Sequence, residues 1–257
     1  MPTPWGSCTR QMAAGGSSPL LCPMTWRSCS PKSGSFIRVR GVEVPHGFGT
    51  KDFALEALRR LLPGRKPQEL GQVHGNKVLI LRKGAPLPQG LPPSDGAVTD
   101  RGDVILIVRT ADCLPVLLWD PETGAVGIAH AGWRGILLGV LREAIKAMRE
   151  AFLCDPERIR VAIGPAIKRC CYRVGEEVSS AFLAKFGPQV IERRKGGTFL
   201  DLALSAKIEL ESMGVERIEE IDLCTFCHGD LFHSFRRSGT ERRQISFIAG
   251  GRDVHPG

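Results

Sequence analysis

The sequence predicts a single α/β domain in which mixed β-sheets are covered by helices. Three observations support this fold class. The chain has 257 residues, 42% of them hydrophobic, which is enough for a large buried core. Helical and strand periods occur in a mixed order along the chain, with some strands joined by hairpins, and no segment repeats. Hairpins mixed with helices favour a mixed sheet over a doubly wound parallel one.

The first 35 residues differ from the remainder of the chain. They contain five prolines and three of the nine cysteines, and they show no helical or strand period. A secretory signal needs a longer apolar stretch than this segment has, and no apolar run in the chain is long enough to span a membrane. We therefore expect residues 1–35 to be a disordered tail or upstream sequence from a start codon placed too early, and residues 36–257 to form the single domain.

In the first half of the domain, short apolar runs alternate with turn residues. Phe36–Val44 alternates in polarity and predicts a strand. Phe53–Leu62 has a helical period and is ended by a Pro-Gly pair. Further strands are predicted at Val78–Leu81, at Ala97-Val98 and at Val104–Val108.

The second half combines a hairpin with longer helices. Pro115–Trp119 and Ala125–Ala129 are apolar runs separated by a short turn, which predicts a hairpin. Leu137–Phe152 carries apolar residues at helical spacing and predicts one long helix. The remaining predicted elements are strands at Arg158–Ile163, Ile218–Leu223 and Ser246–Ala249, and helices at Gly175–Lys185 and Leu202–Met213.

The net charge of +8 and the cysteine usage bound the function. Nucleic acid is a natural partner for a basic chain, but the 35 lysines and arginines are scattered and only one tyrosine is present. A surface rich in arginine, or an anionic small substrate, explains the charge better. An odd, unevenly spread set of cysteines argues against a disulfide scaffold and favours a reducing, cytoplasmic location.

Three residues stand out as candidates for chemistry: His74, Cys113 and His130. Each lies beside a small or turn-forming residue next to a predicted strand. Two imidazoles and a thiolate form a three-ligand zinc set that leaves a position for water or substrate, which is typical of a catalytic site. The spacing leaves two other interpretations open: a Cys–His pair for nucleophilic catalysis, and a loop histidine with a core cysteine.

Two further segments could hold an anion. Gly132 and Gly135 flank the start of a predicted helix, where free N–H groups can bind phosphate. Arg236 and Arg237 follow an aromatic residue and could clamp an oxyanion. A simple turn and a solvated charge pair are the alternative interpretations.

The other cysteines are interpreted as ordinary thiols. Cys224 and Cys227 precede His228 in the C-x-x-C-H spacing of haem attachment, but that chemistry requires export. A zinc site would need a second C-x-x-C pair, and the sequence has none. Cys170 and Cys171 are adjacent, and a local role at a turn is expected for them.

Several segments in order resemble one family, the YfiH-type purine nucleoside phosphorylases, which are also called laccase-domain or polyphenol-oxidase-like proteins. The resemblance covers residues 42–250, and the Thr110–Val116 and His130–Gly135 motifs are its most specific part. The other matching segments are His46–Lys51, Gln72–Gly75, Asp95–Thr99, Ile163–Pro165, Cys171–Gly175 and Cys224–Arg237.

This resemblance implies a layered α/β/β/α catalytic domain similar to that of the cytotoxic necrotising factor toxins. It also implies zinc bound by His74, Cys113 and His130. The implied activity is phosphorolysis of adenosine, inosine, guanosine and methylthioadenosine to the base and (methylthio)ribose-1-phosphate, together with adenosine deamination. The substrates are then purine nucleosides and phosphate, and the enzyme is expected to be a monomer or homodimer.

The remaining candidate site residues follow from combining that activity with the sequence. Asp112, beside Cys113, is the carboxylate expected to transfer a proton or orient a ligand, with turn formation as its alternative role. Phosphate is expected at Lys51, Arg236 and Arg237, with Arg134 as a further candidate. Lys51 replaces the arginine usual in the family, so it attracts phosphate as a point charge but forms no bidentate fork.

Three alternative functions belong to other classes. A Cys–His hydrolase of the peptidoglycan-editing type would use Cys113 and His130 without metal. A copper-dependent, laccase-like polyphenol oxidase needs several coppers, and one His/Cys/His set cannot hold them, so zinc is preferred over copper. A nucleic-acid-binding module rests on the charge alone.

Overall fold

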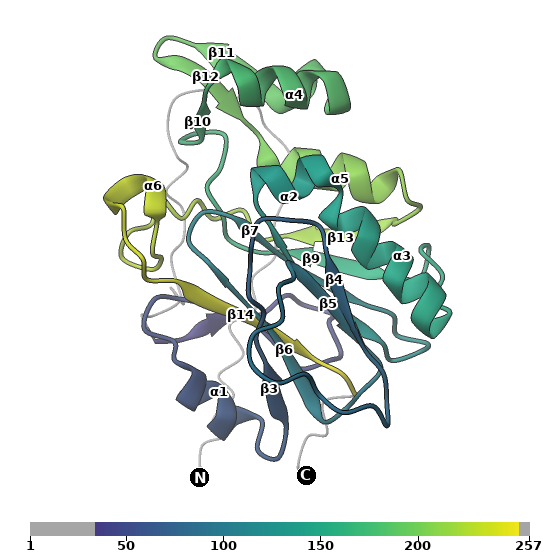
Figure 1. Cartoon of the computed structure of the whole chain (residues 1–257). Coiled ribbons are helices and arrows are strands. Elements are labelled where there is room, and N and C mark those ends of the chain that lie inside the picture. Colours follow the sequence, from purple (N-terminus) through teal and green to yellow (C-terminus); the bar gives the residue numbers. More distant parts are fainter. Residues whose placement is uncertain (1–33, 252–257) are drawn as a thin grey trace.

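The computed structural model describes residues 34–251 of the chain (Figure 1). The predicted tail, residues 1–35, lies outside the described residues except for its last two. Across residues 34–251, no helix is both long enough and apolar enough to cross a membrane.

The larger sheet has six strands in the order β13-β9-β7-β8-β5-β4. The two outer pairs are parallel, whereas the inner pairs are antiparallel, so the sheet is mixed as predicted. The predicted hairpin is its centre. The strands are β4 (Val78–Leu81), β5 (Gly96–Thr99), β7 (Leu114–Trp119), β8 (Val126–Ala131), β9 (Arg160–Ile163) and β13 (Arg217–Glu220).

A second, five-stranded sheet packs against the first, in the order β1-β2-β14-β6-β3. Its inner strands are antiparallel, and only the edge strand β3 runs parallel to its neighbour. The strands are β1 (Phe36–Ile37), β2 (His46–Gly49), β3 (Lys66–Gln68), β6 (Val104–Thr110) and β14 (Gln244–Ala249).

Strand β6 shows how the sequence builds the layers. Its side chains alternate between the two faces of the sheet, as they must in a strand. Val104, Leu106 and Val108 pack between the two sheets, whereas Ile105 and Ile107 pack on the opposite face. All five side chains are fully buried, because both faces of β6 are covered, and this part of the strand is therefore apolar at every position.

Helices cover the outer face of each sheet. Helix α1 (Leu55–Leu61) packs on the five-stranded sheet through Leu58. Helices α3 (Val140–Phe152) and α5 (Leu202–Glu211) pack on the six-stranded sheet and bury the largest core cluster (Figure 1). The order of layers is therefore α/β/β/α, and the predicted single α/β domain is confirmed.

A small lobe lies beyond α2 (Trp133–Leu138) and α5 in Figure 1. It contains a three-stranded antiparallel sheet in the order β10-β12-β11 and helix α4. The turn between β11 and β12 uses two consecutive glycines with positive φ. The bounds are β10 (Arg173–Val174), α4 (Glu176–Phe186), a 3₁₀ turn (Pro188–Val190), β11 (Ile191–Arg194) and β12 (Gly197–Leu200).

The structure corrects three sequence predictions. The helix expected at Leu137–Phe152 is two helices, because Gly139 adopts φ 84° and separates α2 (Trp133–Leu138) from α3. The strand expected at Phe36–Val44 is confined to β1, since the chain turns at Gly41, where φ is 74°. Strand β3 contains Pro67 and was not expected, and its place at a sheet edge is where proline is tolerated.

Candidate metal centre

The structure brings together the three residues selected from the sequence. His74 lies in the loop before β4, Cys113 in the turn between β6 and β7, and His130 near the end of β8. One ligand atom from each lies within 4.8 Å of the others, and the imidazole rings meet edge to face with centroids 4.8 Å apart. His130 is buried, Cys113 is half-buried and His74 is exposed. The site therefore opens to solvent on the side of His74.

Two backbone features place these ligands. His74 adopts φ 61° and Asp112, just before Cys113, adopts φ 92°, so both ligand loops turn through the left-handed region. Gly132 fills the gap between the loops, since a Cβ there would lie 3.0 Å from the Cys113 sulfur and 3.2 Å from the His74 ring. The packing of the site therefore requires a glycine at position 132.

Asp95, which the sequence analysis did not select, organises both histidines. Its fully buried carboxylate accepts a hydrogen bond from His130 Nδ1 at 2.8 Å. It also accepts the backbone N–H groups of Val73, His74 and Gly75 at 3.2, 2.9 and 2.7 Å. The hydrogen bond to Asp95 keeps a proton on Nδ1 of His130, so Nε2 is the nitrogen that would bind a metal, after losing its own proton.

The same contacts set the charges of the metal-free site. Burial opposes ionisation of Cys113, but hydrogen bonds from His130 and His74 lower the pKa of the thiol to about 6. Burial likewise disfavours a charged His130, but Asp95 and Cys113 raise the pKa of its imidazole to about 9. The carboxyl of Asp95 would be harder to ionise because of burial, yet His130 and the loop amides lower its pKa. Without a metal, Cys113 is therefore a thiolate at neutral pH, which is the ligand form of cysteine.

Asp112 has both carboxylate oxygens engaged. One accepts the hydroxyl of Thr225 at 2.6 Å, and the other accepts the backbone N–H of Arg236 at 2.7 Å. Its side chain is buried, and it joins the Cys113 turn to two segments more than 110 residues away in the chain. This geometry suits the orienting role expected for Asp112 better than proton transfer.

The basic candidates are placed in different ways. The guanidinium of Arg236 lies 5.2 Å from the centre of the Tyr172 ring and donates to the carbonyl of Arg173. Burial and the charge of Cys113 raise the pKa of the Tyr172 phenol, while the charge of Arg236 lowers it. Its backbone N–H also donates to Asp112, the residue before Cys113, so the structure links Arg236 to the loop of one metal ligand.

The other three cations serve nearby segments. Lys51 donates to the carbonyl of Gly229 at 3.1 Å. Arg237 donates to the carbonyls of Thr225, Phe226 and Phe232 at 2.7 to 2.9 Å, which makes it a brace for this loop. Arg134 is exposed and lies over the ring of its neighbour Trp133, at the start of α2.

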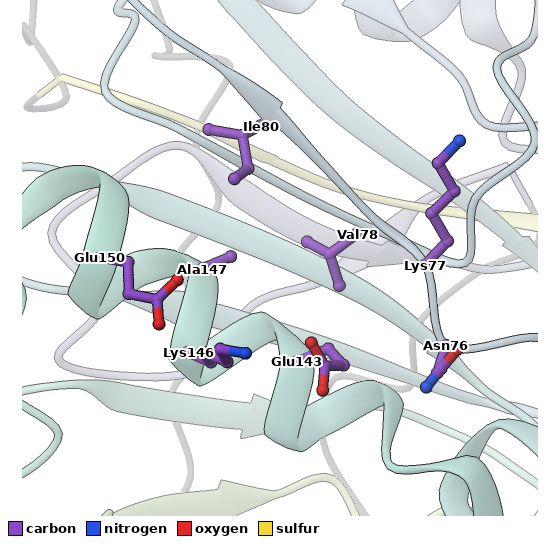
Figure 2. A pocket seen from close by; sticks show the side chains of 8 residues that line it. All are labelled: Asn76, Lys77, Val78, Ile80, Glu143, Lys146, Ala147 and Glu150. Atoms are coloured by element: carbon purple, nitrogen blue, oxygen red, sulfur yellow. The ribbon is translucent and has the colours of Figure 1, made fainter.

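A groove of about 410 Å³ lies near this site without belonging to it. It runs between β4 and α3 (Figure 2), and its lining is largely charged at the α3 side. None of the three candidate ligands lines it. Its residues are Asn76, Lys77, Val78, Ile80, Glu143, Lys146, Ala147 and Glu150.

Besides Asp95, the sequence analysis missed Thr225, Tyr172 and a second cysteine cluster. Asp95 and Thr225 are fully buried polar residues, and each belongs to a segment that resembles the family. A carboxylate immediately before a buried strand was the available signal for Asp95. Nothing local in the sequence marked the second cysteine cluster, because its halves lie more than 50 residues apart.

The fold and the family model that matches it place this four-layer α/β domain among laccase-domain proteins. The chain belongs to this YfiH-type family. The family model described as multi-copper polyphenol oxidoreductase laccase matches residues 55–250.

Individual relatives agree with this assignment. The chain is 36% identical over 232 residues to the Escherichia coli protein named purine nucleoside phosphorylase YfiH, covering 83% of this chain and 91% of that one. It is 33% identical over 183 residues to the mouse protein named purine nucleoside phosphorylase LACC1, covering 68% of this chain but only 41% of the mouse protein. The crystal structure of the Bacillus licheniformis hypothetical protein YfiH superposes with a TM-score of 0.73 at 28% identity, over 79% of this chain and 91% of that one.

Proposed function

We propose that this protein is a zinc-dependent purine nucleoside phosphorylase that also deaminates adenosine. Its substrates would be adenosine, inosine, guanosine or methylthioadenosine with phosphate, and its products the base and (methylthio)ribose-1-phosphate. The observation that carries the proposal is the convergence of His74, Cys113 and His130 around Asp95. The names of the bacterial and mouse relatives supply the reaction class.

The donor set fits zinc. Two imidazoles and a thiolate leave one tetrahedral position open, and the carboxylate behind His130 fixes the tautomer that binds metal. When bound, zinc would supply Lewis acidity and a water of lowered pKa. A copper oxidase of the multi-copper kind needs further ligands around the same centre, and across residues 34–251 the only other such cluster consists of cysteines.

Individual residues of the chain would have different roles in the reaction. In phosphorolysis a phosphate oxygen attacks C1′ of the ribose, the bond from C1′ to the purine nitrogen breaks, and the base takes a proton. Arg236, whose guanidinium lies beside Tyr172, would attract the phosphate, and Lys51 would supply a second positive charge. Asp112 would hold the Cys113 turn against the segment that carries Arg236. In deamination water attacks C6 of adenine and ammonia leaves.

The proposal is tested by Cys113→Ala. We expect this variant to lose one equivalent of zinc. It should also lose both activities: the formation of adenine and ribose-1-phosphate from adenosine plus phosphate, and the formation of inosine from adenosine. The matched control is Cys154→Ala, since that buried thiol is hydrogen-bonded to Thr123 on a different part of the fold. A Cys113→Ala protein with normal inosine phosphorolysis would exclude the metal mechanism.

One observation favours a second candidate, a Cys–His hydrolase of the peptidoglycan-editing type. The metal-free site pairs a Cys113 thiolate with a charged His130, which is how a nucleophilic cysteine is activated. Metal-stripped protein that cleaves peptidoglycan fragments, and loses that activity when Cys113 is alkylated, would support this candidate. If zinc added to the metal-stripped protein restores nucleoside turnover, and peptidoglycan fragments are not cleaved, the result would support the phosphorylase.

We also propose that the enzyme works in the cytoplasm as a monomer or homodimer. The six cysteines of residues 34–251 are thiols, which supports a reducing compartment. Size-exclusion chromatography with light scattering would establish the oligomeric state.

A further inference from the structure

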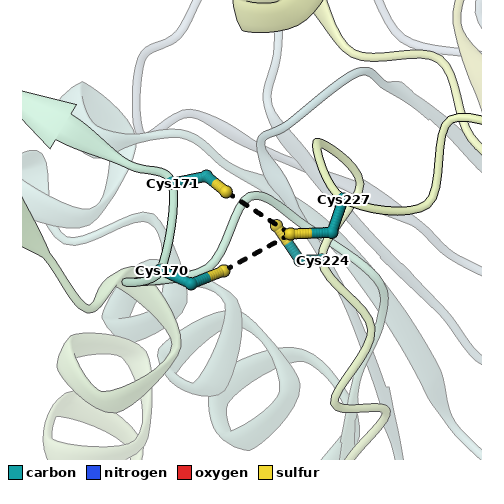
Figure 3. A group of neighbouring side chains, drawn as sticks. All are labelled: Cys170, Cys171, Cys224 and Cys227. Atoms are coloured by element: carbon teal, nitrogen blue, oxygen red, sulfur yellow. Dashed lines mark hydrogen bonds between the residues drawn. The ribbon is translucent and has the colours of Figure 1, made fainter. Parts of the chain in front are cut away.

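A second group of ligand atoms lies outside the His–Cys–His site. It consists of Cys170 and Cys171, in the loop between β9 and β10, and Cys224 and Cys227, in the loop after β13. Figure 3 shows the four side chains pointing toward one another. Cys227 lies 56 residues after Cys171 and 57 residues after Cys170 in the chain.

The spacing of the sulfurs matches one tetrahedral ion. All four sulfurs lie within 4.8 Å of one another, and Cys227 Sγ lies 3.4 Å from Cys171 Sγ and 3.8 Å from Cys170 Sγ. Sulfurs bound to zinc at about 2.3 Å and at tetrahedral angles lie about 3.8 Å from each other. A disulfide would use only two of the four thiols, whereas a single ion explains why all four converge.

The backbone holds the cluster without the help of an ion. Ala166 and Cys224 form a parallel bridge, with Ala166 N–H donating to the carbonyl of Leu223 at 3.3 Å and Thr225 N–H donating to that of Ala166 at 3.0 Å. Both loops then turn tightly: Cys171 N–H donates to the carbonyl of Lys168 at 2.9 Å. The C-x-x-C segment closes with His228 N–H donating to the carbonyl of Cys224 at 3.0 Å.

The surrounding charge suits an anionic metal–thiolate centre. Four thiolates and one divalent cation carry a net charge of −2, which needs positive neighbours. Arg194 donates to the carbonyl of Cys170 at 2.6 Å, and Arg237 donates to the carbonyl of Phe226, between Cys224 and Cys227, at 2.9 Å. Two guanidinium groups thus reach the backbone of both halves.

We propose that Cys170, Cys171, Cys224 and Cys227 bind one zinc ion in a closed structural site. Each half of the site adjoins a residue of the candidate metal centre, since Cys171 precedes Tyr172 and Cys224 precedes Thr225, the residue that holds Asp112. The structural zinc therefore ties together two loops that border the catalytic ligands. The four thiols are sufficient for this site, so it does not depend on the proposed function.

Zinc content of the full-length protein, measured by mass spectrometry after purification under reducing conditions, tests the inference. We expect two equivalents in the unmodified protein, one in Cys113→Ala and none in Cys113→Ala combined with Cys227→Ser. Cys154→Ser is the control and should keep both equivalents. A Cys113→Ala protein that binds no zinc, even when zinc is added, would overturn the inference.

Two further measurements distinguish the outcomes if the cluster variants fail to fold. X-ray absorption of zinc in Cys113→Ala should show only sulfur neighbours at about 2.3 Å. A first shell that contains nitrogen or oxygen would overturn the four-cysteine site. Intact mass of metal-free Cys113→Ala should show all cluster cysteines as thiols, and the loss of two hydrogens would assign the cluster as a disulfide pair instead.

Discussion

Replacing Asp95 by asparagine should weaken zinc binding although the new side chain has nearly the same shape. Oδ1 of Asp95 accepts from His74 N–H and His130 Nδ1, and Oδ2 accepts from Val73 N–H and Gly75 N–H. An asparagine has one oxygen, so two of these four contacts are lost however the amide is turned. If its NH₂ faces His130, the ring must keep its proton on Nε2, and that nitrogen can no longer bind a metal.

The expected size of the effect follows from the role of the carboxylate. Loss of a carboxylate behind a ligating histidine typically costs 10- to 100-fold in metal affinity or activity. That corresponds to about 1.4 to 2.8 kcal/mol, since each tenfold change is about 1.4 kcal/mol. Zinc affinity would be measured by competition with a chromophoric chelator, and kcat/KM for inosine phosphorolysis on the same preparation.

Asp100→Asn is the matched control for this experiment. Asp100 lies just beyond the other end of β5, is exposed, and accepts one hydrogen bond from Lys83 N–H, which an asparagine oxygen can also accept. The zinc affinity of Asp100→Asn should equal that of the unmodified protein. An Asp95→Asn protein with the zinc affinity of the unmodified enzyme would refute the role assigned to Asp95.

Three further substitutions test the site, the core and the ion network in which Lys168 and Lys207 pair with the half-buried Glu220. Gly132→Ala should weaken zinc binding about tenfold while the fold is kept, because the added methyl group would lie 3.0 Å from the Cys113 sulfur; chelator competition measures this. Gly164→Ala should lower the free energy of unfolding by about 1 to 3 kcal/mol in urea denaturation, because its Cβ would lie 2.2 Å from the ring of Phe48. In Glu220→Gln, Tm should fall less steeply with decreasing pH in the acid range than it does in the unmodified protein. Burial alone would raise the pKa of Glu220, but the ammonium groups of two neighbouring lysines lower it, so its stabilisation is complete above about pH 4.5 and is lost as the pH falls through the folded-state pKa.

The two stability predictions have matched controls in the chain. Gly175→Ala adds a methyl group that meets nothing within 4 Å and should not change the free energy of unfolding. Glu219→Gln removes an exposed carboxylate beside Glu220 and should leave the acid limb of the Tm profile unchanged. Equal profiles for Glu220→Gln and the unmodified protein would show that the ion network contributes no pH-dependent stability.

Local sequence patterns predicted the elements that are buried and long. The hairpin of β7 and β8 follows from two apolar runs joined by a short turn, and the apolar period of α3 follows its buried face. Strand β3 and the β10-β12-β11 sheet could not be predicted in this way. They are short, charged or proline-containing, and pairing with neighbours distant in sequence makes them strands.

The candidate site likewise contains residues that local sequence patterns indicate and residues that depend on partners distant in the chain. His74, Cys113 and His130 could be selected because each lies beside a small or turn-forming residue next to a predicted strand. The role of Asp95 could not, because its carboxylate is defined by partners 20 to 35 residues away. The cysteine cluster depends on the bridge between Ala166 and Cys224, which no local pattern indicates.

Zinc content and turnover of Cys113→Ala, measured on one preparation, test the central claim most directly. The protein should lose one equivalent of zinc and all formation of base and ribose-1-phosphate from inosine plus phosphate, while Cys154→Ala keeps both. A Cys113→Ala protein that still cleaves inosine at the rate of the unmodified enzyme would contradict a catalytic His–Cys–His metal centre.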